Sequence, residues 1–317
     1  MSHIDDFLHA GNNIFEEDVM QKLRCRFVAG KLMEKDFSYV GFQVKQTDAG
    51  VIIDQSQYLA DMKVPVVSAN RMSQKDDELT PTEYTMFRSV VGSMNWVAHG
   101  TRPDILYDLI ELSMHFNQAT VTDLSRAVKI ARKLKEADST IFFPALKGNP
   151  SDWKLVVFTD AALGNLPDGF SSTAARLVFM VDEDSRSCIL AFKSNKIARV
   201  VRSTLAAEVL SLQEGLEEAL YLQDMVKELL QTDVKIHAYI DNKSTIDSVN
   251  STKLVKDKRL HRDIAAIKQE LNEQIVESLA WVPDKEQLAN CLTKKGASNV
   301  SLLAVLHTGV LPKLPEC

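Results

Sequence analysis

The sequence has no long apolar run, few cysteines and no excess of basic residues, and each absence excludes a class of protein. No apolar stretch approaches the ~18 residues that a membrane-spanning helix needs, so a membrane protein is not expected. The N-terminus lacks the basic and apolar regions of a signal peptide, so secretion is not expected either. No CxxC pair is present, and we predict reduced thiols of an intracellular protein at all four cysteines: Cys25, Cys188, Cys291 and Cys317.

Basic residues are outnumbered by acidic ones. The chain has 37 Lys and Arg against 43 Asp and Glu, which gives a formal net charge of -6. Compact nucleic-acid-binding proteins are more often basic. Any nucleic-acid site in this chain should therefore be a local patch rather than a field over the whole molecule. With 317 residues, 45% of them hydrophobic, the chain is long enough for two domains.

The first region, residues 1–146, is predicted to be a small α+β unit. Residues 39–44 and 51–53 have the composition of two strands joined by a turn, which predicts a hairpin. Thr80 and Glu83 flank a proline in the pattern of a helix start, with Thr80 as the N-cap. Further helices are expected after residues 101–104 and over residues 124–137.

Residues 147–152 form the best boundary in the chain, because Lys-Gly-Asn-Pro-Ser-Asp favours turns. The second region, residues 152–296, is predicted to be α/β, a mixed sheet with helices on its faces, and residues 297–317 are expected to be a C-terminal tail. The strands are expected at 154–160, 174–181, 187–193, 234–240 and 276–282. The helices are expected at 205–229, 244–249, 262–274 and 285–294.

Three carboxylates lie at the edges of apolar runs in the second region. Asp160 ends the first predicted strand, Glu208 lies in the first turns of the long helix, and Asp241 ends the fourth strand. The three would converge if the first and fourth strands are neighbours in the sheet. Converging carboxylates repel one another unless divalent cations lie between them, and such a cluster is a usual way to hold Mg²⁺ for phosphodiester chemistry.

The segments around these carboxylates resemble the RNase H domain of copia-type retrotransposon polyproteins. Four motifs occur in the order of that family, and the segments linking them match as well. Each motif alone is a weak signal, whereas four in order are specific. The resemblance implies an RNase H-like fold. The motifs are Phe-Thr-Asp160, Ser-Thr-Leu-Ala-Ala-Glu208, Tyr-Ile-Asp241-Asn-Lys-Ser and Leu-Ala-Asn290-Cys-Leu-Thr-Lys294.

The first region resembles the end of the polymerase in the same family. Asp5 and Asp6 are similar to the second half of its Tyr-Xaa-Asp-Asp motif, and residues 87–96 and 101–104 are similar to the segment that joins polymerase to RNase H. The resemblance implies the C-terminal part of a reverse transcriptase: the end of the palm, a thumb or connection, and RNase H. Because the rest of the polymerase is missing, we expect no DNA polymerase activity from this chain alone, and we expect the missing half to be a partner.

By this resemblance the reaction is endonucleolytic cleavage of the RNA strand of an RNA–DNA hybrid. Asp160, Glu208 and Asp241 would hold two Mg²⁺ ions about 4 Å apart, one activating the attacking water and the other stabilising the leaving 3′ oxygen. Mn²⁺ is the alternative metal. Selection of RNA would depend on the 2′-hydroxyl and on the shape of the hybrid. The family copies RNA in cytoplasmic particles, so a cytoplasmic location is expected, with the nucleus as the alternative.

The last motif departs from the family at one candidate catalytic position. The family usually has an aspartate where this chain has Asn290, and asparagine keeps a carbonyl acceptor but loses the charge. One interpretation is a slow enzyme that works on three carboxylates. The others are a nucleic-acid-binding module without catalysis and a degenerate fragment with a scaffold role. The three intact carboxylates favour the enzyme.

Two basic stretches lie between the acidic motifs and are candidates for nucleic-acid binding. They would line a groove for phosphates and contribute affinity that falls with salt, without selecting a sequence. The alternative is an ordinary solvated face. The candidates are Lys193, Lys196, Arg199 and Arg202 before Glu208, and Lys256, Lys258, Arg259 and Arg262 after Asp241.

Overall fold

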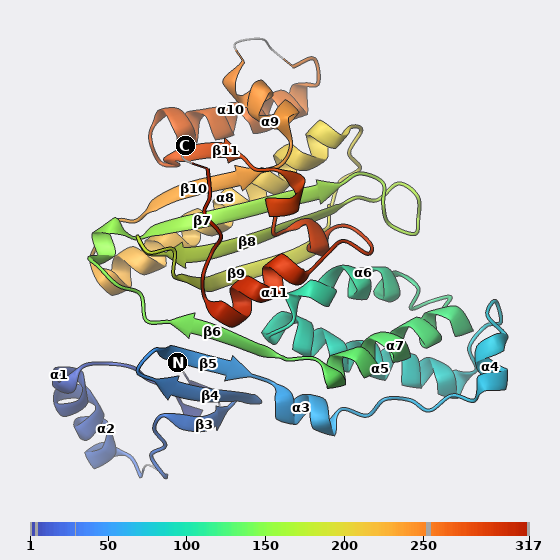
Figure 1. The fold of residues 1–317 in the computed structure, drawn as a ribbon, viewed down its shortest axis with the longest axis horizontal. Coiled ribbons are helices and arrows are strands. Elements are labelled where there is room, and N and C mark those ends of the chain that lie inside the picture. The colour runs from blue at the N-terminus through green and yellow to red at the C-terminus, as the bar shows by residue number, and fades with distance from the viewer. Residues whose placement is uncertain (1, 4–5, 29, 252–254, 316–317) are drawn as a thin grey trace.

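The computed structural model describes residues 2–3, 6–28, 30–251 and 255–315. The first part of the chain contains a four-stranded sheet and the second part a five-stranded one. Figure 1 shows the first sheet below the second, with a group of helices beside them. Within the described residues, no helix is long and apolar enough to cross a membrane. Cys25, Cys188 and Cys291 form no disulfide in the described residues, and Cys317 lies outside them.

The chain begins with short elements. The strands β1 (Ser2–His3) and β2 (Asp6–Phe7) pair antiparallel. They are followed by α1 (Asn13–Phe15), a π-helical segment (Glu16–Met20) and α2 (Gln21–Arg26). Of the two aspartates that resemble the polymerase motif, Asp5 lies outside the described residues and Asp6 belongs to β2.

A four-stranded antiparallel sheet follows. It consists of β3 (Asp36–Tyr39), β4 (Phe42–Thr47), β5 (Gly50–Asp54) and β6 (Thr140–Pro144), in that order. The predicted hairpin is confirmed as β4–β5. The strand predicted over residues 39–44 is wrong at its start, because Val40 and Gly41 have φ of 48° and 78° and form a turn between β3 and β4.

Helices connect β5 to β6: α3 (Ser56–Asp61), α4 (Ala69–Ser73), α5 (Pro81–Gly100), α6 (Leu106–Met114) and α7 (Val121–Glu136). The predicted start of α5 is confirmed as a capping box. The Thr80 hydroxyl accepts a hydrogen bond from the Glu83 amide, and the Glu83 carboxylate accepts one from the Thr80 amide at 2.8 Å. The motif at residues 101–104 leads into a 3₁₀ turn (Pro103–Ile105) just before α6.

The second part of the chain forms a five-stranded mixed sheet in the order β11-β10-β7-β8-β9. The central strand β7 is antiparallel to β8 and parallel to β10. The first and fourth strands of this region are therefore neighbours, as the predicted convergence of the carboxylates requires. This is the RNase H-like α/β fold that the sequence predicts. The strands are β7 (Lys154–Ala162), β8 (Thr173–Val181), β9 (Ser187–Lys196), β10 (Lys235–Ile240) and β11 (Ser278–Trp281).

Both faces of this sheet are covered. The helix α8 (Thr204–Leu230) packs along β7 and β8 on one face, with α9 (Lys243–Asn250) and α10 (Lys258–Asn272) beside it. Side chains alternate along β7: Leu155 and Val157 join the core under α8, whereas Val156 and Phe158 join the core on the opposite face. A strand buried on both faces reads as a continuous apolar run, as β7 does.

The helix predicted over residues 285–294 is wrong. Two 3₁₀ turns (Asp284–Glu286 and Asn290–Leu292) replace it, separated by an extended Gln287. The Gln287 side chain donates hydrogen bonds to the backbone carbonyls of Thr159 at 3.0 Å and Tyr239 at 3.4 Å. A buried amide that bridges two strand ends fixes the segment in a shape that a regular helix would not allow.

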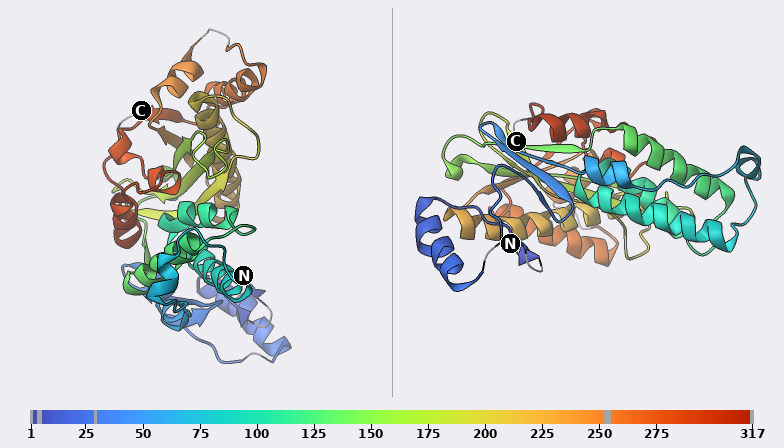
Figure 2. Two further views of the ribbon diagram at one scale, coloured as in Figure 1. Left: turned by 90° about the vertical axis from the view of Figure 1, so that its right-hand side faces the viewer. Right: turned by 90° about the horizontal axis from the view of Figure 1, so that it is seen from below.

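The expected C-terminal tail contains a helix, α11 (Val300–Thr308), which packs on β6. One cluster of buried apolar side chains includes Leu112 of α6, Ile141 of β6, Phe158 of β7 and Leu306 of α11. Both sheets therefore contribute to a shared core across the turn-rich segment at residues 147–152. Figure 2 shows the two parts in contact from two further directions.

Candidate active site

Asp160, Glu208 and Asp241 come together at one edge of the five-stranded sheet. Each offers a carboxylate oxygen, and these oxygens all lie within 4.8 Å of one another. Asp160 lies near the end of β7 and Asp241 directly follows β10, and these two strands are parallel neighbours, so their ends meet. Glu208 is on the second turn of α8. The convergence expected from the sequence is thus present.

The helix α8 reaches this position because it lies unusually close to β7. Gly215 of α8 faces the strand, and a Cβ at this position would lie 2.4 Å from Cγ2 of Thr159, so only glycine permits this approach. The buried Ser211 hydroxyl donates to the backbone carbonyls of Asp160 at 2.8 Å and Ala175 at 3.1 Å. These contacts fix the helix against the strand, which sets the position of Glu208 relative to Asp160.

Glu208 has the most perturbed carboxyl group of the cluster. Its side chain is buried, and its Oε2 atom has no hydrogen-bond partner among the residues that the structure describes. Burial, followed by the nearby carboxylates of Asp160 and Asp241, raises its pKa to about 9. A buried carboxyl oxygen that faces two other carboxylates without a donor fits a cation as its missing partner.

Asp160 is fully buried at the centre of the cluster. The Thr293 hydroxyl donates to its Oδ2, and the Lys294 ammonium donates to its Oδ1 at 3.2 Å. Burial raises the pKa of Asp160 to about 6, although Lys294 and Thr293 oppose the rise. Burial also raises the pKa of Asp241, again opposed by Lys294. All three carboxyl groups therefore hold their protons more tightly than usual, because burial disfavours their charged forms.

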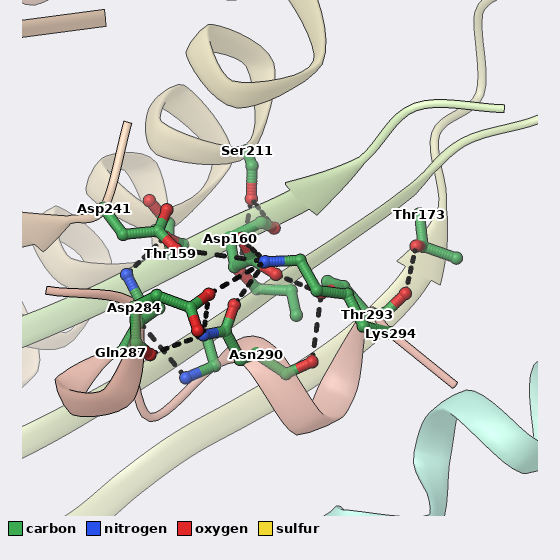
Figure 3. Close-up of polar contacts among 12 residues, drawn as sticks. Thr159, Asp160, Thr173, Ser211, Asp241, Asp284, Gln287, Asn290, Thr293 and Lys294 are labelled. Carbon is green, nitrogen blue, oxygen red and sulfur yellow. Dashed lines mark hydrogen bonds and ion pairs between the residues drawn. The ribbon is translucent and has the colours of Figure 1, made fainter. Parts of the chain in front are cut away.

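Asn290 contacts the cluster through Lys294. Its amide nitrogen donates to the backbone carbonyl of Asp284 at 2.7 Å and to Oδ1 of Asp284 at 3.0 Å, and its Oδ1 accepts from the Lys294 ammonium. Figure 3 shows Lys294 reaching between the carboxylates from the turn that carries Asn290. The last motif contains Thr293 and Lys294, but the sequence predicts a role only for Asn290. Their spacing of three and four residues from Asn290 is the pattern that indicates their closeness to it.

Four of the predicted basic residues line one cleft of 490 Å³. The cleft lies between the segment before α8 and the start of α10, so folding brings the two basic stretches together. It also includes Ala206 of α8, which is two residues before Glu208. Two acidic residues partly neutralise this positive charge, because Arg199 forms an ion pair with Asp263 and Asp257 itself lines the cleft. The four residues are Arg199, Arg202, Lys258 and Arg259.

The other four basic candidates do not line this cleft. Lys193 is exposed on β9, and Lys256 and Arg262 are exposed near the start of α10. Lys196 forms an ion pair with Asp168 at 3.3 Å and lies 5.9 Å from the centre of the Phe170 ring. The structure thus separates the basic candidates into four that line the cleft and four that do not.

Comparisons with protein-family models and with curated proteins give no match. Solved structures do match about half of the chain. An RNase H1 isolated from compost by a metagenomic approach is 20% identical, with 44% of this chain and 92% of that chain covered and a TM-score of 0.34. The N-terminal RNase H domain of a Mycobacterium tuberculosis protein is 19% identical, with 48% and 98% covered and a TM-score of 0.33.

A viral reverse transcriptase is also among the similar structures. The protease-reverse transcriptase of prototype foamy virus is 14% identical, with 52% of this chain and 21% of that chain covered and a TM-score of 0.32. These similarities concern the fold.

Proposed function

We propose that this chain is an RNase H-type endonuclease that cleaves the RNA strand of RNA–DNA hybrids, and that it derives from the C-terminal part of a copia-type reverse transcriptase. The observation that carries the proposal is the convergence of Asp160, Glu208 and Asp241 with an unpartnered oxygen on Glu208. The four motifs in the family's order support the same assignment. The missing polymerase half is the proposed partner, and the proposed location is cytoplasmic.

The three carboxylates would hold divalent cations, Mg²⁺ or Mn²⁺. When bound, such cations supply Lewis-acid chemistry at a scissile phosphate and an acidified water. The protein's own part is to hold three oxygens in place on β7, α8 and β10, and to exclude water around Asp160 and Glu208. Glu208 must lose the proton that its burial favours before it can serve as a ligand.

The cleft at the starts of α8 and α10 would bind the phosphates of the hybrid. Its three arginines and one lysine would provide charge-assisted hydrogen bonds to phosphate oxygens. Ala206, which also lines the cleft, lies two residues before Glu208 in α8, so the cleft adjoins the helix that carries this carboxylate. The protein as a whole is acidic, so this local patch would determine where nucleic acid binds.

A second candidate function is a nucleic-acid-binding protein with weak or no catalysis. The observation that favours it is the pair Asn290 and Lys294: an amide replaces the expected aspartate, and an ammonium lies against two of the three carboxylates. Both features reduce the negative charge available to a metal.

The experiment is cleavage of a labelled RNA–DNA hybrid in Mg²⁺ and in Mn²⁺, with Asp160→Asn and Asn290→Asp variants. An RNase H predicts cleavage by the unmodified chain and loss of at least about a hundredfold in rate in Asp160→Asn. Cleavage by Asn290→Asp but not by the unmodified chain would support the second candidate. If neither protein cleaves the hybrid although both bind it, the enzymatic proposal is overturned.

A further inference from the structure

The Lys294 side chain, which is 39% exposed, extends its ammonium group to the carboxylate cluster. Its Nζ atom is 3.2 Å from Oδ1 of Asp160, 3.9 Å from Oδ2 of Asp241 and 3.8 Å from Oδ1 of Asp284. It also donates to the side-chain carbonyl of Asn290. Figure 3 shows these oxygens converging on the lysine nitrogen from three separate segments of the chain. The ammonium thus has an oxygen environment similar to the one a metal cation would require.

The position of this lysine is fixed by its own segment. The Lys294 amide donates to the backbone carbonyl of Asn290 at 3.1 Å, which closes the turn from which the side chain extends. The Asn290 amide group is held by Asp284, so its carbonyl oxygen is directed to the ammonium. An aspartate at this position could not donate to Asp284. The asparagine therefore orients an acceptor for the lysine.

The charge of Lys294 has a direct consequence for a metal. Two of its contacts, Asp160 and Asp241, are among the three carboxylates within 4.8 Å of one another. A divalent cation held by these carboxylates would share its oxygens with the ammonium, and two cations so close repel each other. One of them has to withdraw for the other to bind.

We propose that Lys294 is an internal cation that neutralises the carboxylate cluster in the metal-free protein and competes with divalent cations for Asp160 and Asp241. Asn290 is the residue that positions it. This inference rests on the proposed metal site. It predicts a site that is stable when empty and that binds metal more weakly than its three carboxylates alone would allow.

The test compares Lys294→Met with Lys295→Met, which removes a neighbouring positive charge outside the cluster, where Lys295 pairs with Glu111 at 3.4 Å. Binding of Mn²⁺ is measured by isothermal titration calorimetry and by the electron paramagnetic resonance signal of free Mn²⁺. We expect Lys294→Met to bind Mn²⁺ about tenfold more tightly than the unmodified chain, and Lys295→Met to change affinity much less. The melting temperature in EDTA should fall in Lys294→Met.

Equal or weaker Mn²⁺ binding in Lys294→Met would overturn the inference while leaving the proposed metal site intact. Absence of Mn²⁺ binding in every protein would overturn both. A second measurement uses the unmodified chain, so it does not depend on the folding of a variant. The ¹³Cε signal of Lys294, assigned by its absence in Lys294→Arg, should shift when Mg²⁺ is added, and an unchanged signal would contradict displacement of the lysine.

Discussion

At the scale of single residues, the protonation of Glu208 should determine how the stability of the metal-free protein depends on pH. Its pKa is about 9 because it is buried beside Asp160 and Asp241. An acid whose pKa rises on folding stabilises the protein fully below its ordinary pKa, and this stability is lost as the pH rises through the raised pKa. The relevant window therefore extends from the usual glutamate range to about pH 9.

We predict that Glu208→Gln makes the metal-free protein less sensitive to rising pH, because glutamine cannot ionise. Melting temperatures in EDTA between pH 5 and pH 9 would measure this. The unfolding free energy of Glu208→Gln relative to the unmodified chain should increase with pH, by at most about 1.4 kcal/mol per pH unit. Glu217→Gln, an exposed position on the same helix, should show no such increase. A constant difference for Glu208→Gln would contradict the buried, protonated state.

Residue-scale sequence reasoning identified the carboxylates but missed what surrounds them. Asp160, Glu208 and Asp241 could be found because each borders an apolar run in an ordered motif. The positions of Lys294 and Gln287 could not, because a predicted helix over residues 285–294 would have turned those side chains in other directions. The actual turns depend on hydrogen bonds to strands more than 40 residues away in sequence, which local patterns do not contain.

At the scale of elements, two helix starts form the basic cleft. The segment before α8 contributes Arg199 and Arg202, and the start of α10 contributes Lys258 and Arg259. Neither stretch alone provides all four basic residues that line the cleft. The binding site therefore depends on how α8 and α10 pack together, and it should respond to substitutions on both.

We predict that the double variant Arg202→Ala, Arg259→Ala weakens binding of an RNA–DNA hybrid and makes the affinity less dependent on salt. Each lost phosphate contact should reduce the slope of log K against log salt by about one, so the pair should reduce it by about two. Fluorescence anisotropy in EDTA, which prevents cleavage, would measure it. Arg132→Ala, Lys133→Ala on α7 removes the same charge from an exposed surface and serves as the control. Equal slopes in the two double variants would refute the cleft.

Among the elements, predictions were correct where the local sequence has a clear periodicity or a helix cap. They failed where a strand pairs with another strand that is far away in the sequence. The start of α5 at Thr80 and the strands β7 and β8 follow from their local sequences. The strand β6 was not predicted, because its five residues have a partner, β5, some 90 positions earlier. The helix α11 was assigned to a tail because a short apolar segment does not by itself distinguish a helix from a strand.

At the scale of the whole molecule, the two sheets share one core. The cluster that contains Leu306 of α11 also contains Ile141 of β6 and Phe158 of β7. A polar link reinforces this contact, because Asn299, the residue before α11, donates to Asp104 at 2.7 Å, and Asp104 pairs with Arg102. The boundary at residues 147–152 remains a prediction. Because the two parts share a core, we expect them to unfold together rather than as two independent domains.

We predict that Leu306→Ala destabilises both sheets together. Truncation of this buried side chain should cost about 2–5 kcal/mol of unfolding free energy, because it leaves a cavity in the shared core. Hydrogen exchange would show reduced protection in β4 and β5 as well as in β7. Val300→Ala, at an exposed position of the same helix, should have little effect. Loss of protection in only one sheet would indicate two independent folding units.

The location of α11 also has a consequence for biosynthesis. The helix packs on β6, whose strand partner β5 spans Gly50–Asp54, yet the residues of α11, Val300–Thr308, are translated some 250 codons after β5. While the intervening chain leaves the ribosome, the apolar surface that α11 will cover stays exposed, and such surfaces recruit chaperones or aggregate. Folding of the first sheet is therefore expected to be completed late, after the segment that covers it has been made.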